Sequence, residues 1–225
     1  MFRRNLVKKI IIFGSGDYSE VVLKIIIENK SYNLVGYIDI ENKNTKNLKQ
    51  LKYLGKIEQN KSLLNNSDIS GIVAIGCNYI RKEVVDEVHK INNKFIWRTL
   101  KHPSVSFCDT SSVGEGSVIV TGVVINGRSK IGSHCLINTN SSLNHDNILD
   151  DFSSTGPGVN TGGNVLIGKY CYIGIGSSIK HNITIKNNTI IGAQSYVNSD
   201  CEGNSLYYGI PAKRVSDWIY GKKYL

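Results

Sequence analysis

The first hundred residues alternate short apolar runs with segments whose apolar residues recur at helical spacing. The runs are KKIIIFGSG (8–16), NLVGYIDI (33–40), SGIVAIG (70–76) and KFIWRTL (94–100), and the helical segments are YSEVVLKIIIENK (18–30) and YIRKEVVDEVHKIN (79–92). Strands separated by helices form a parallel sheet with right-handed crossovers. This pattern predicts a small Rossmann-like α/β domain over residues 1–100.

The rest of the chain has a different period. Counting every sixth residue from Val113 to Val197 gives 15 positions. Thirteen of these are aliphatic, and the other two are Thr155 and Thr161. Small or β-branched residues mostly follow four positions later, and glycine often follows directly. A strict period of six is typical of a hexapeptide parallel β-helix, in which each aliphatic residue points inward and stacks on the coil below. We therefore predict a parallel β-helix with a short C-terminal extension over residues 101–225.

Composition narrows the function classes. The net charge of +9 favours phosphorylated small molecules or nucleic acids as partners, but the lysines and arginines are scattered without a dense basic run, which argues against nucleic acid. The sequence contains no run of 18 apolar residues, so it predicts no membrane span. The five cysteines are widely separated and form no CxxC pair, so we expect reduced thiols in a cytoplasmic protein and no metal site: Cys77, Cys108, Cys135, Cys171 and Cys201.

With these repeats in place, the whole chain resembles a group of bacterial sugar acyltransferases. These are the PglD-type enzymes that N-acetylate nucleotide-linked 4-amino-sugars and the NeuD-type enzymes that O-acetylate sialic acids. The resemblance runs through IIIFGSGD, VGYID, AIGCNYIRKE, KHPSVSF, INTNSSLNHD, GPGVNTGGNVLIGKYCYIGIGSSI and YYGIPAKRV. It implies a left-handed β-helix with three hexads per coil, a homotrimer with active sites between subunits, and direct acetyl transfer from acetyl-CoA in surface polysaccharide biosynthesis.

The same resemblance implies catalytic residues. His145 follows INTNSSLN and precedes an acid, so it matches the histidine that takes a proton from the attacking acceptor. Asn138 matches an asparagine seven residues earlier, and Gly163 matches the glycine whose backbone N–H faces the acetyl carbonyl. Asp146 is our candidate to orient the imidazole. Two later aspartates remain alternatives for that role: Asp150 and Asp151.

Further positions are implied to meet acetyl-CoA. Ser154 stands where some members of the group carry a second histidine that contacts the acetyl or CoA portion. CoA is expected to thread between coils near Gly163, Gly174 and Gly176. Lys213 and Arg214 either meet CoA phosphates or begin a solvated C-terminal helix.

The segment GSGDYS, between the first strand and the first helix, is a partial dinucleotide fingerprint without its third glycine. Asp39 follows at the distance where an acid holds a ribose hydroxyl, which alone weakly indicates NAD. The domain lacks a second mononucleotide half, so a single nucleotide, the handle of a nucleotide-sugar, is favoured, with its phosphate at the helix N-terminus. The candidate contacts are Gly14, Ser15, Gly16, Asp17, Tyr18, Asp39, Asn78 and Arg81, the last being either a phosphate partner or a surface arginine.

Three functions follow from these features. The first is N-acetylation of a nucleotide-linked 4-amino-sugar. The second, left open because Asp17-Tyr18 stands where the group usually has Gly-His or a further glycine, is O-acetylation of sialic acid or a related nonulosonic acid. The third is a non-catalytic scaffold that binds a nucleotide-sugar or NAD. The two other histidines of the β-helix, His134 and His181, are expected on the coil surface.

Overall fold

The computed structural model describes residues 8–42, 48, 50–222 and 224. Its contacts divide the chain into two units. The first comprises Met1–Ile75 and Glu83–Arg98, and the second comprises Gly76–Lys82 and Thr99–Leu225. The break after Arg98 is close to the predicted boundary, but residues 76–82, which contain the start of a helix, group with the second unit. Within the described residues no helix is long and apolar enough to cross a membrane.

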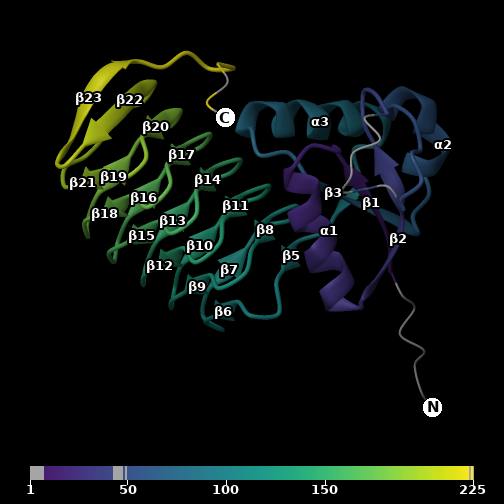
Figure 1. The fold of residues 1–225 in the computed structure, drawn as a ribbon, viewed down its shortest axis with the longest axis horizontal. Helices are drawn as coiled ribbons and strands as arrows, with labels where there is room; N and C mark the ends of the chain where they lie inside the picture. The colour runs from purple at the N-terminus through teal and green to yellow at the C-terminus, as the bar shows by residue number, and fades with distance from the viewer. Residues whose placement is uncertain (1–7, 43–47, 49, 223, 225) are drawn as a thin grey trace. The chain divides into compact units, whose positions relative to one another are not determined.

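The first unit is a four-stranded parallel sheet with helices, as predicted (Figure 1). Its strands lie in the order β2 (Tyr32–Ile38), β1 (Lys8–Phe13), β3 (Ile69–Val73) and β4 (Ile96–Trp97). Its helices are α1 (Tyr18–Asn29), α2 (Lys61–Leu64) after a 3-10 turn at Ile57–Asn60, and most of α3 (Asn78–Ile91). The apolar run of β1 is buried from Ile10 to Phe13, which explains why it reads as a continuous apolar segment.

The second unit is the predicted β-helix, a coil of short strands, most of them of two residues, whose successive coils pair in parallel to form three sheets (Figure 1). One sheet contains β7 (Ser112–Val113), β10 (Lys130–Ile131), β13 (Ile148–Leu149), β16 (Leu166–Ile167) and β19 (Thr184–Ile185). Another contains β6 (Ser106–Phe107), β9 (Val124–Ile125), β12 (Ser142–Leu143), β15 (Asn160–Thr161), β18 (Ser178–Ile179) and β21 (Tyr196–Val197). The last contains β5 (Leu100–Lys101), β8 (Val118–Ile119), β11 (Leu136–Ile137), β14 (Ser154–Thr155), β17 (Tyr172–Ile173), β20 (Thr189–Ile191), β22 (Ser205–Gly209) and β23 (Ala212–Asp217).

Paired residues of neighbouring coils are 18 positions apart, so three hexads make one coil. Val113 pairs with Ile131, Ile131 with Leu149, and Leu149 with Ile167. The coil begins earlier than the aliphatic phase, because β5 and β6 already pair in the same register. It ends with a shortened coil, in which Ile191 pairs with Tyr207, 16 residues later.

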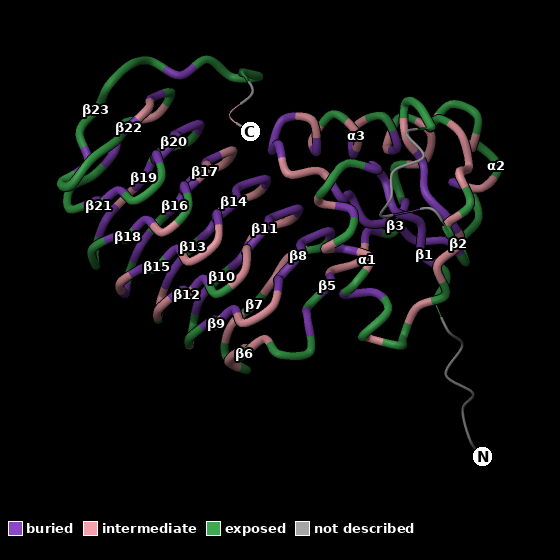
Figure 2. Tube along the Cα trace, in the orientation of Figure 1, coloured by how far each residue is buried: buried purple, intermediate pink, exposed green. Residues whose placement is uncertain are grey.

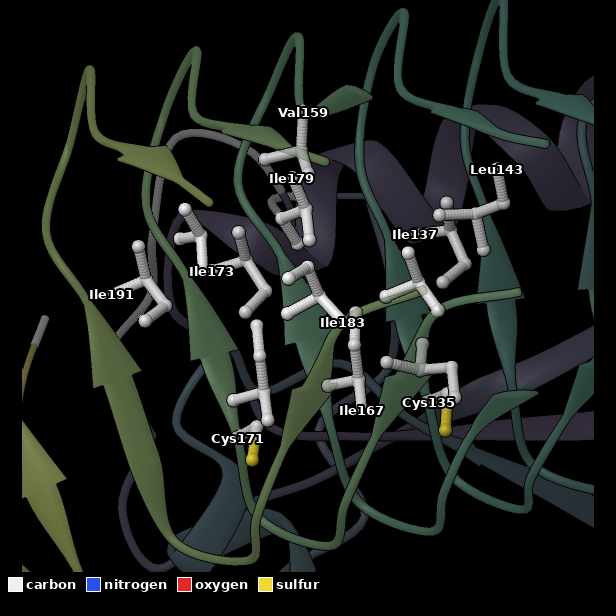
Figure 3. Close-up of a cluster of buried hydrophobic side chains, with 14 of the residues drawn as sticks. Cys135, Ile137, Leu143, Val159, Ile167, Cys171, Ile173, Ile179, Ile183 and Ile191 are labelled. Carbon is white, nitrogen blue, oxygen red and sulfur yellow. The ribbon is translucent and has the colours of Figure 1, made fainter. Parts of the chain in front are cut away.

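The inward residues of successive coils form one continuous apolar core (Figure 3). Ile137, Ile173 and Ile191 are all inaccessible to solvent, whereas the corners of the coil carry most of the exposed residues (Figure 2). Three of the five free cysteines belong to this core, and burial raises the pKa of their thiols to about 12: Cys135, Cys171 and Cys201.

Three corners join the three sheets, and each is named here by what it carries. The histidine corner comprises residues 126–129, 144–147, 162–165 and 180–183. The helix corner comprises residues 132–135, 150–153, 168–171 and 186–188, and the first turn of α3 packs on it. The glycine corner comprises residues 120–123, 138–141, 156–159, 174–177 and 192–195. Each corner turns through a left-handed residue, and at the histidine corner these are Arg128, Asp146, Asn164 and Asn182.

The C-terminal extension is a hairpin followed by an aromatic tail. β23 pairs antiparallel with β22, so the segment that was predicted as a possible helix start is a strand. Within it Arg214 donates from Nε to Ser205 Oγ at 3.0 Å and forms an ion pair with Asp217. Lys213 lies exposed on the same strand.

A core substitution tests the inward phase. Ile179 is 3% exposed, so Ile179→Ala should lower the free energy of unfolding by about 2–5 kcal/mol through lost burial and a cavity. Ser178, its outward neighbour on β18, is exposed, and Ser178→Ala should change stability by less than about 0.5 kcal/mol. Urea denaturation followed by circular dichroism measures both values, and equal effects would contradict the assigned phase.

Candidate active site

The backbone of His145 is fixed between two coils. Its own N–H donates to Asn144 Oδ1 at 2.9 Å, and its carbonyl accepts the N–H of Asn164, in the next coil, at 3.1 Å. Asp146, which follows it, donates its N–H to Gly127 O of the preceding coil at 3.0 Å. The left-handed backbone of Asp146 (φ 59°) completes the turn, and the side chain of His145 remains about half exposed. The histidine is therefore held by its backbone and reachable through its side chain.

Asp146 is the carboxylate that contacts this imidazole. His145 Nδ1 lies 2.7 Å from Asp146 Oδ2. Hydrogen bonds from Arg128 and His145 lower the pKa of Asp146 to about 2, so the carboxylate is ionised at neutral pH and can only accept. Nδ1 therefore carries the hydrogen, and the lone pair of Nε2 is left for a proton from elsewhere.

Gly163 lies one coil beyond His145, directly against its ring. A Cβ built on Gly163 would fall 2.4 Å from His145 Cε1 and 2.6 Å from Nε2, so only glycine leaves room for the imidazole. Gly163 is buried, and among the residues that the structure describes no protein acceptor takes its N–H. The residue before His145 supplies a side-chain oxygen for the histidine N–H, whereas the residue before Gly163 is Gly162, which has none. A buried residue whose N–H has no protein acceptor is a candidate donor to a ligand oxygen.

A buried amide that the sequence did not single out connects these two segments. Asn147 is 2% exposed, and its Nδ2 donates to Asn144 O at 2.7 Å and to Thr161 Oγ1 at 2.7 Å. Its Oδ1 accepts the N–H of Val165 at 2.7 Å. Asn147 and Thr161 thereby fix the distance between the coil of His145 and the coil of Gly163.

The other predicted catalytic residue, Asn138, lies on a different corner. It belongs to the glycine corner, where its N–H donates to Thr155 Oγ1 at 3.1 Å and its Oδ1 accepts the N–H of Thr139 at 2.8 Å. Within one chain the structure therefore brings together His145, Asp146 and Gly163, but not Asn138.

The alternative orienting acids are also elsewhere. Asp150 and Asp151 occupy the helix corner, where Asp151 pairs with Lys169 at 3.0 Å and accepts the N–H of Ser133 at 2.9 Å. Asp150 Oδ1 accepts the N–H of Asp151 at 3.0 Å. Neither contacts the imidazole of the same chain.

Two of the predicted CoA-binding glycines lie on the glycine corner near the C-terminal end of the coil. Gly174 donates its N–H to Ile191 O at 2.8 Å, and Gly176, with φ 67°, donates to Pro157 O at 2.9 Å. Gly174 also lines a cavity of about 250 Å³ whose other walls are mainly apolar and aromatic: Tyr172, Ile175, Ile190, Ile191, Gly192, Ala193, Leu206, Tyr208, Trp218 and Tyr224. A second cavity, of about 470 Å³, lies beside Asp146 and is lined by Thr110, Arg128, Lys130, Asp146 and Ile148.

Three of the residues predicted to contact ligands are buried in a hydrogen-bonded cluster. Arg81 and Asn78 are fully buried, and Ser154 is 2% exposed. Arg81 donates to His134 O at 2.8 Å, to Asn78 Oδ1 at 2.7 Å and to Ser154 Oγ at 3.0 Å. Ser154 Oγ in turn donates to Asn78 Oδ1 at 2.6 Å, and Asn78 Nδ2 donates to Cys171 O at 2.9 Å. These side chains fasten the first turn of α3 to the helix corner, and the predicted ligand contacts of Asn78, Arg81 and Ser154 find no support in this arrangement.

His134 is also misplaced by the sequence prediction. It is 3% exposed rather than on the coil surface, and its ring stacks on Phe152 at a centroid distance of 4.9 Å. His181 is exposed as expected.

In the first unit the predicted loop is assembled around Asp39. Its Oδ2 accepts both the N–H (2.7 Å) and the hydroxyl (2.5 Å) of Ser15, and its Oδ1 accepts the N–H of Ile40 at 2.6 Å. Gly14 has φ 97°, a conformation that suits glycine, and Gly16 and Asp17 are exposed. Asp17 is the N-cap of α1 and Tyr18 its first residue. Asp39 therefore fixes both the backbone and the hydroxyl of Ser15 in the loop that precedes α1.

Comparisons with known proteins match both parts of the chain. Residues 9–88 match the family model for the PglD N-terminal domain, and residues 164–199 match the bacterial transferase hexapeptide model. The solved structure of a GDP-perosamine N-acetyl transferase from Caulobacter crescentus, a histidine-to-alanine variant in complex with CoA and GDP-perosamine, is 27% identical with a TM-score of 0.84, over 93% of this chain and 97% of that one. The acetyltransferase domain of PglB from Neisseria gonorrhoeae is 24% identical with a TM-score of 0.81, over 92% and 100%. The resemblance and the fold class predicted from the sequence are confirmed.

The contact between Gly163 and His145 can be tested directly. Gly163→Ala should leave the β-helix folded but push the imidazole away from Asp146, because the added methyl overlaps the ring. Imidazole ¹⁵N chemical shifts should then lose the signature of a single Nδ1–H tautomer. Gly127→Ala, one coil before His145, meets only Thr110 and Cys108 side chains at 3.1 Å or more and should keep the wild-type spectrum. An unchanged spectrum in Gly163→Ala would show that the ring does not occupy this position.

Proposed function

We propose that this protein transfers the acetyl group of acetyl-CoA to the amine of a nucleotide-linked 4-amino-sugar. The observation that carries the proposal is the pairing of an imidazole, polarised by Asp146, with a buried and unpartnered N–H at Gly163. The similarity to a GDP-perosamine N-acetyl transferase over almost the whole of both chains supports the substrate class. In two solved complexes of that enzyme with CoA and GDP-perosamine, one and the same histidine is replaced, by alanine or by asparagine. We take His145 as the counterpart of that histidine.

The chemistry assigns one task to each group. The amine nitrogen attacks the thioester carbonyl carbon while His145 Nε2 takes the proton that the nitrogen loses. The carbonyl oxygen becomes an oxyanion, and the N–H of Gly163 donates to it. When the carbon–sulfur bond breaks, the imidazolium returns the proton to the departing thiolate, giving the amide and free CoA. Asp146 stabilises the imidazolium during the interval.

The placement of the predicted residues supports an active site between chains of a homotrimer. His145 and Gly163 lie on the histidine corner, whereas Asn138, Gly174 and Gly176 lie on the glycine corner. In a ring of three identical chains two different surfaces of each chain meet, so the glycine corner of one subunit can meet the histidine corner of the next. Acetyl-CoA then lies between them, with Gly174 and Gly176 along its path.

The remaining parts of the proposal concern the acceptor and the compartment. We assign the nucleotide to the loop of Gly14, Ser15, Gly16, Asp17 and Tyr18 with Asp39, and the reaction to the cytoplasm. The five free cysteines agree with a reducing compartment. The product serves surface polysaccharide or glycoprotein glycans.

An acceptor screen tests the function. CoA release should be observed with acetyl-CoA and one of the UDP-, GDP- or dTDP-linked 4-amino-sugars, and not with sialic acids. Release with sialic acids alone would replace N-acetylation by O-acetylation. Absence of both release and acetyl-CoA binding by calorimetry would favour a non-catalytic scaffold.

Replacing the base should separate chemistry from binding. His145→Ala should lower kcat by about 10²- to 10⁴-fold, the usual contribution of a general base, with little change in the Kd of acetyl-CoA. His89→Ala, in α3, serves as the control and should keep wild-type kcat. Near-normal turnover of His145→Ala would remove the histidine from the mechanism.

Mixed trimers test the shared site. His145→Ala and Asn138→Ala homotrimers should each be impaired, but their coexpression should restore activity, because an interface that takes His145 from one subunit and Asn138 from the other is intact. Light scattering should give a mass three times the chain mass of 24.9 kDa. Mixed trimers that are no more active than the parent variants would place the whole site within one chain.

A further inference from the structure

The carboxylate of Asp146 also pairs with an arginine, Arg128, to which the proposed reaction assigns no role. Arg128 lies one coil before Asp146 on the histidine corner, and both residues have left-handed backbones, with φ 58° and 59°. Arg128 Nε donates to Asp146 Oδ1 and Nη2 donates to Oδ2, each at 2.7 Å. Two parallel bonds from one planar guanidinium fix the plane of the carboxylate as well as its position.

The same carboxylate oxygen serves both neighbours. Asp146 Oδ2 accepts from Arg128 Nη2 and from His145 Nδ1, both at 2.7 Å. Arg128, Asp146 and His145 therefore form one chain of hydrogen bonds, and a rotation of the carboxylate would break both contacts at once. The backbone of Arg128 is itself held, because its N–H donates to Thr110 Oγ1 at 3.1 Å.

Folding stability is a weak reason for this pair. The side chain of Arg128 is 67% exposed and that of Asp146 is 30% exposed, and ion pairs this open to solvent contribute little to stability. An effect on His145 is a stronger reason. The guanidinium stabilises the ionised carboxylate and partly cancels its negative charge at the imidazole. Among the described residues, the other charged or titratable groups near this corner are Cys108 and Asp109 in the preceding coil, Lys130 in the cavity wall, and Lys180 and His181 in the coil beyond Gly163.

We propose that Arg128 is a positioning residue for His145, which acts through Asp146 to fix the orientation of the imidazole and to limit the electrostatic effect of the carboxylate on it. The proposal rests on the proposed function, in which His145 is the base. It makes Arg128 a third member of the catalytic chain that does not touch substrate.

Three variants with opposite signatures test it in the full-length enzyme. Arg128→Ala should lower kcat by about tenfold with a smaller change in KM, because the carboxylate is no longer fixed. It should also move the acid limb of the kcat/KM profile to higher pH by about half a unit, because a positive charge near the imidazole is lost. Asp146→Asn should move the same limb to lower pH. Arg128→Lys should leave the limb near its wild-type position but should have only part of the wild-type kcat. Lysine keeps the positive charge but cannot form the two parallel hydrogen bonds of the guanidinium.

The chain offers a matched control. Lys169 and Asp151 form another ion pair between coils, also 18 residues apart, at the helix corner, with a similar 45% and 34% exposure. Lys169→Ala should change neither kcat nor the acid limb. If Arg128→Ala behaves like Lys169→Ala in an active enzyme, Arg128 is a surface ion pair only.

A second measurement does not depend on turnover. In wild-type protein the imidazole ¹⁵N shifts of His145 should show one Nδ1–H tautomer, and Arg128→Ala should mix the two tautomers, with circular dichroism confirming an unchanged fold. Identical ¹⁵N spectra would overturn the proposal even if no acceptor has been found. Conversely, if the wild-type protein transfers no acetyl group but Arg128→Ala shows the predicted spectral change, only the proposed function is rejected.

Discussion

In the β-helix each residue stacks on the residue 18 positions earlier, and this register decides which side chains can meet. It places Gly163 against His145 and Asp146 against Arg128, pairs that are distant in sequence yet in direct contact. The register in turn depends on the inward aliphatic residues, because a slip along the coil would bring polar residues into the core. The core thus sets the geometry of the candidate site, because its buried residues determine the distances between the side chains on the coil surface.

Because the register is a property of the sequence, most of the fold could be predicted from it. The period of six gave the inward phase from Val113 to Val197, and the alternation of runs and helical segments gave the parallel sheet. What the period does not report is what covers the coil from outside. Arg81 and Ser154 have the polarity of ligand contacts, and only the docking of the first turn of α3 on the helix corner reveals that both are buried. His134 is also buried, with its ring stacked on Phe152. The segment of Lys213 became a strand because it could pair with β22.

Three polar residues interrupt the apolar pattern of the repeat. Thr155 and Thr161 are the two polar residues of the inward phase, and Asn147 interrupts the row of small or β-branched residues beside it. A buried hydroxyl or amide is costly unless it is hydrogen-bonded, so three such residues within less than one coil need a reason. Thr155 accepts the N–H of Asn138, Thr161 accepts the N–H of Asn144, and Asn147 joins the coil of His145 to that of Gly163. Polar interruptions of a hexad pattern therefore indicate the site independently of any family motif.

The fixed distance between these coils matters for the proposed reaction. An oxyanion donor is effective when it is already aimed at the place where negative charge develops and has no competing partner. Gly162 provides the second condition, because it lacks the side-chain oxygen that Asn144 offers to the next N–H in the equivalent position. Asn147 and Thr161 provide the first, because they fix one coil relative to the other. Gly163 must itself lack a side chain so that the imidazole fits against it, and two adjacent glycines thus serve two different requirements: one leaves an N–H without a partner, and the other leaves space for the imidazole.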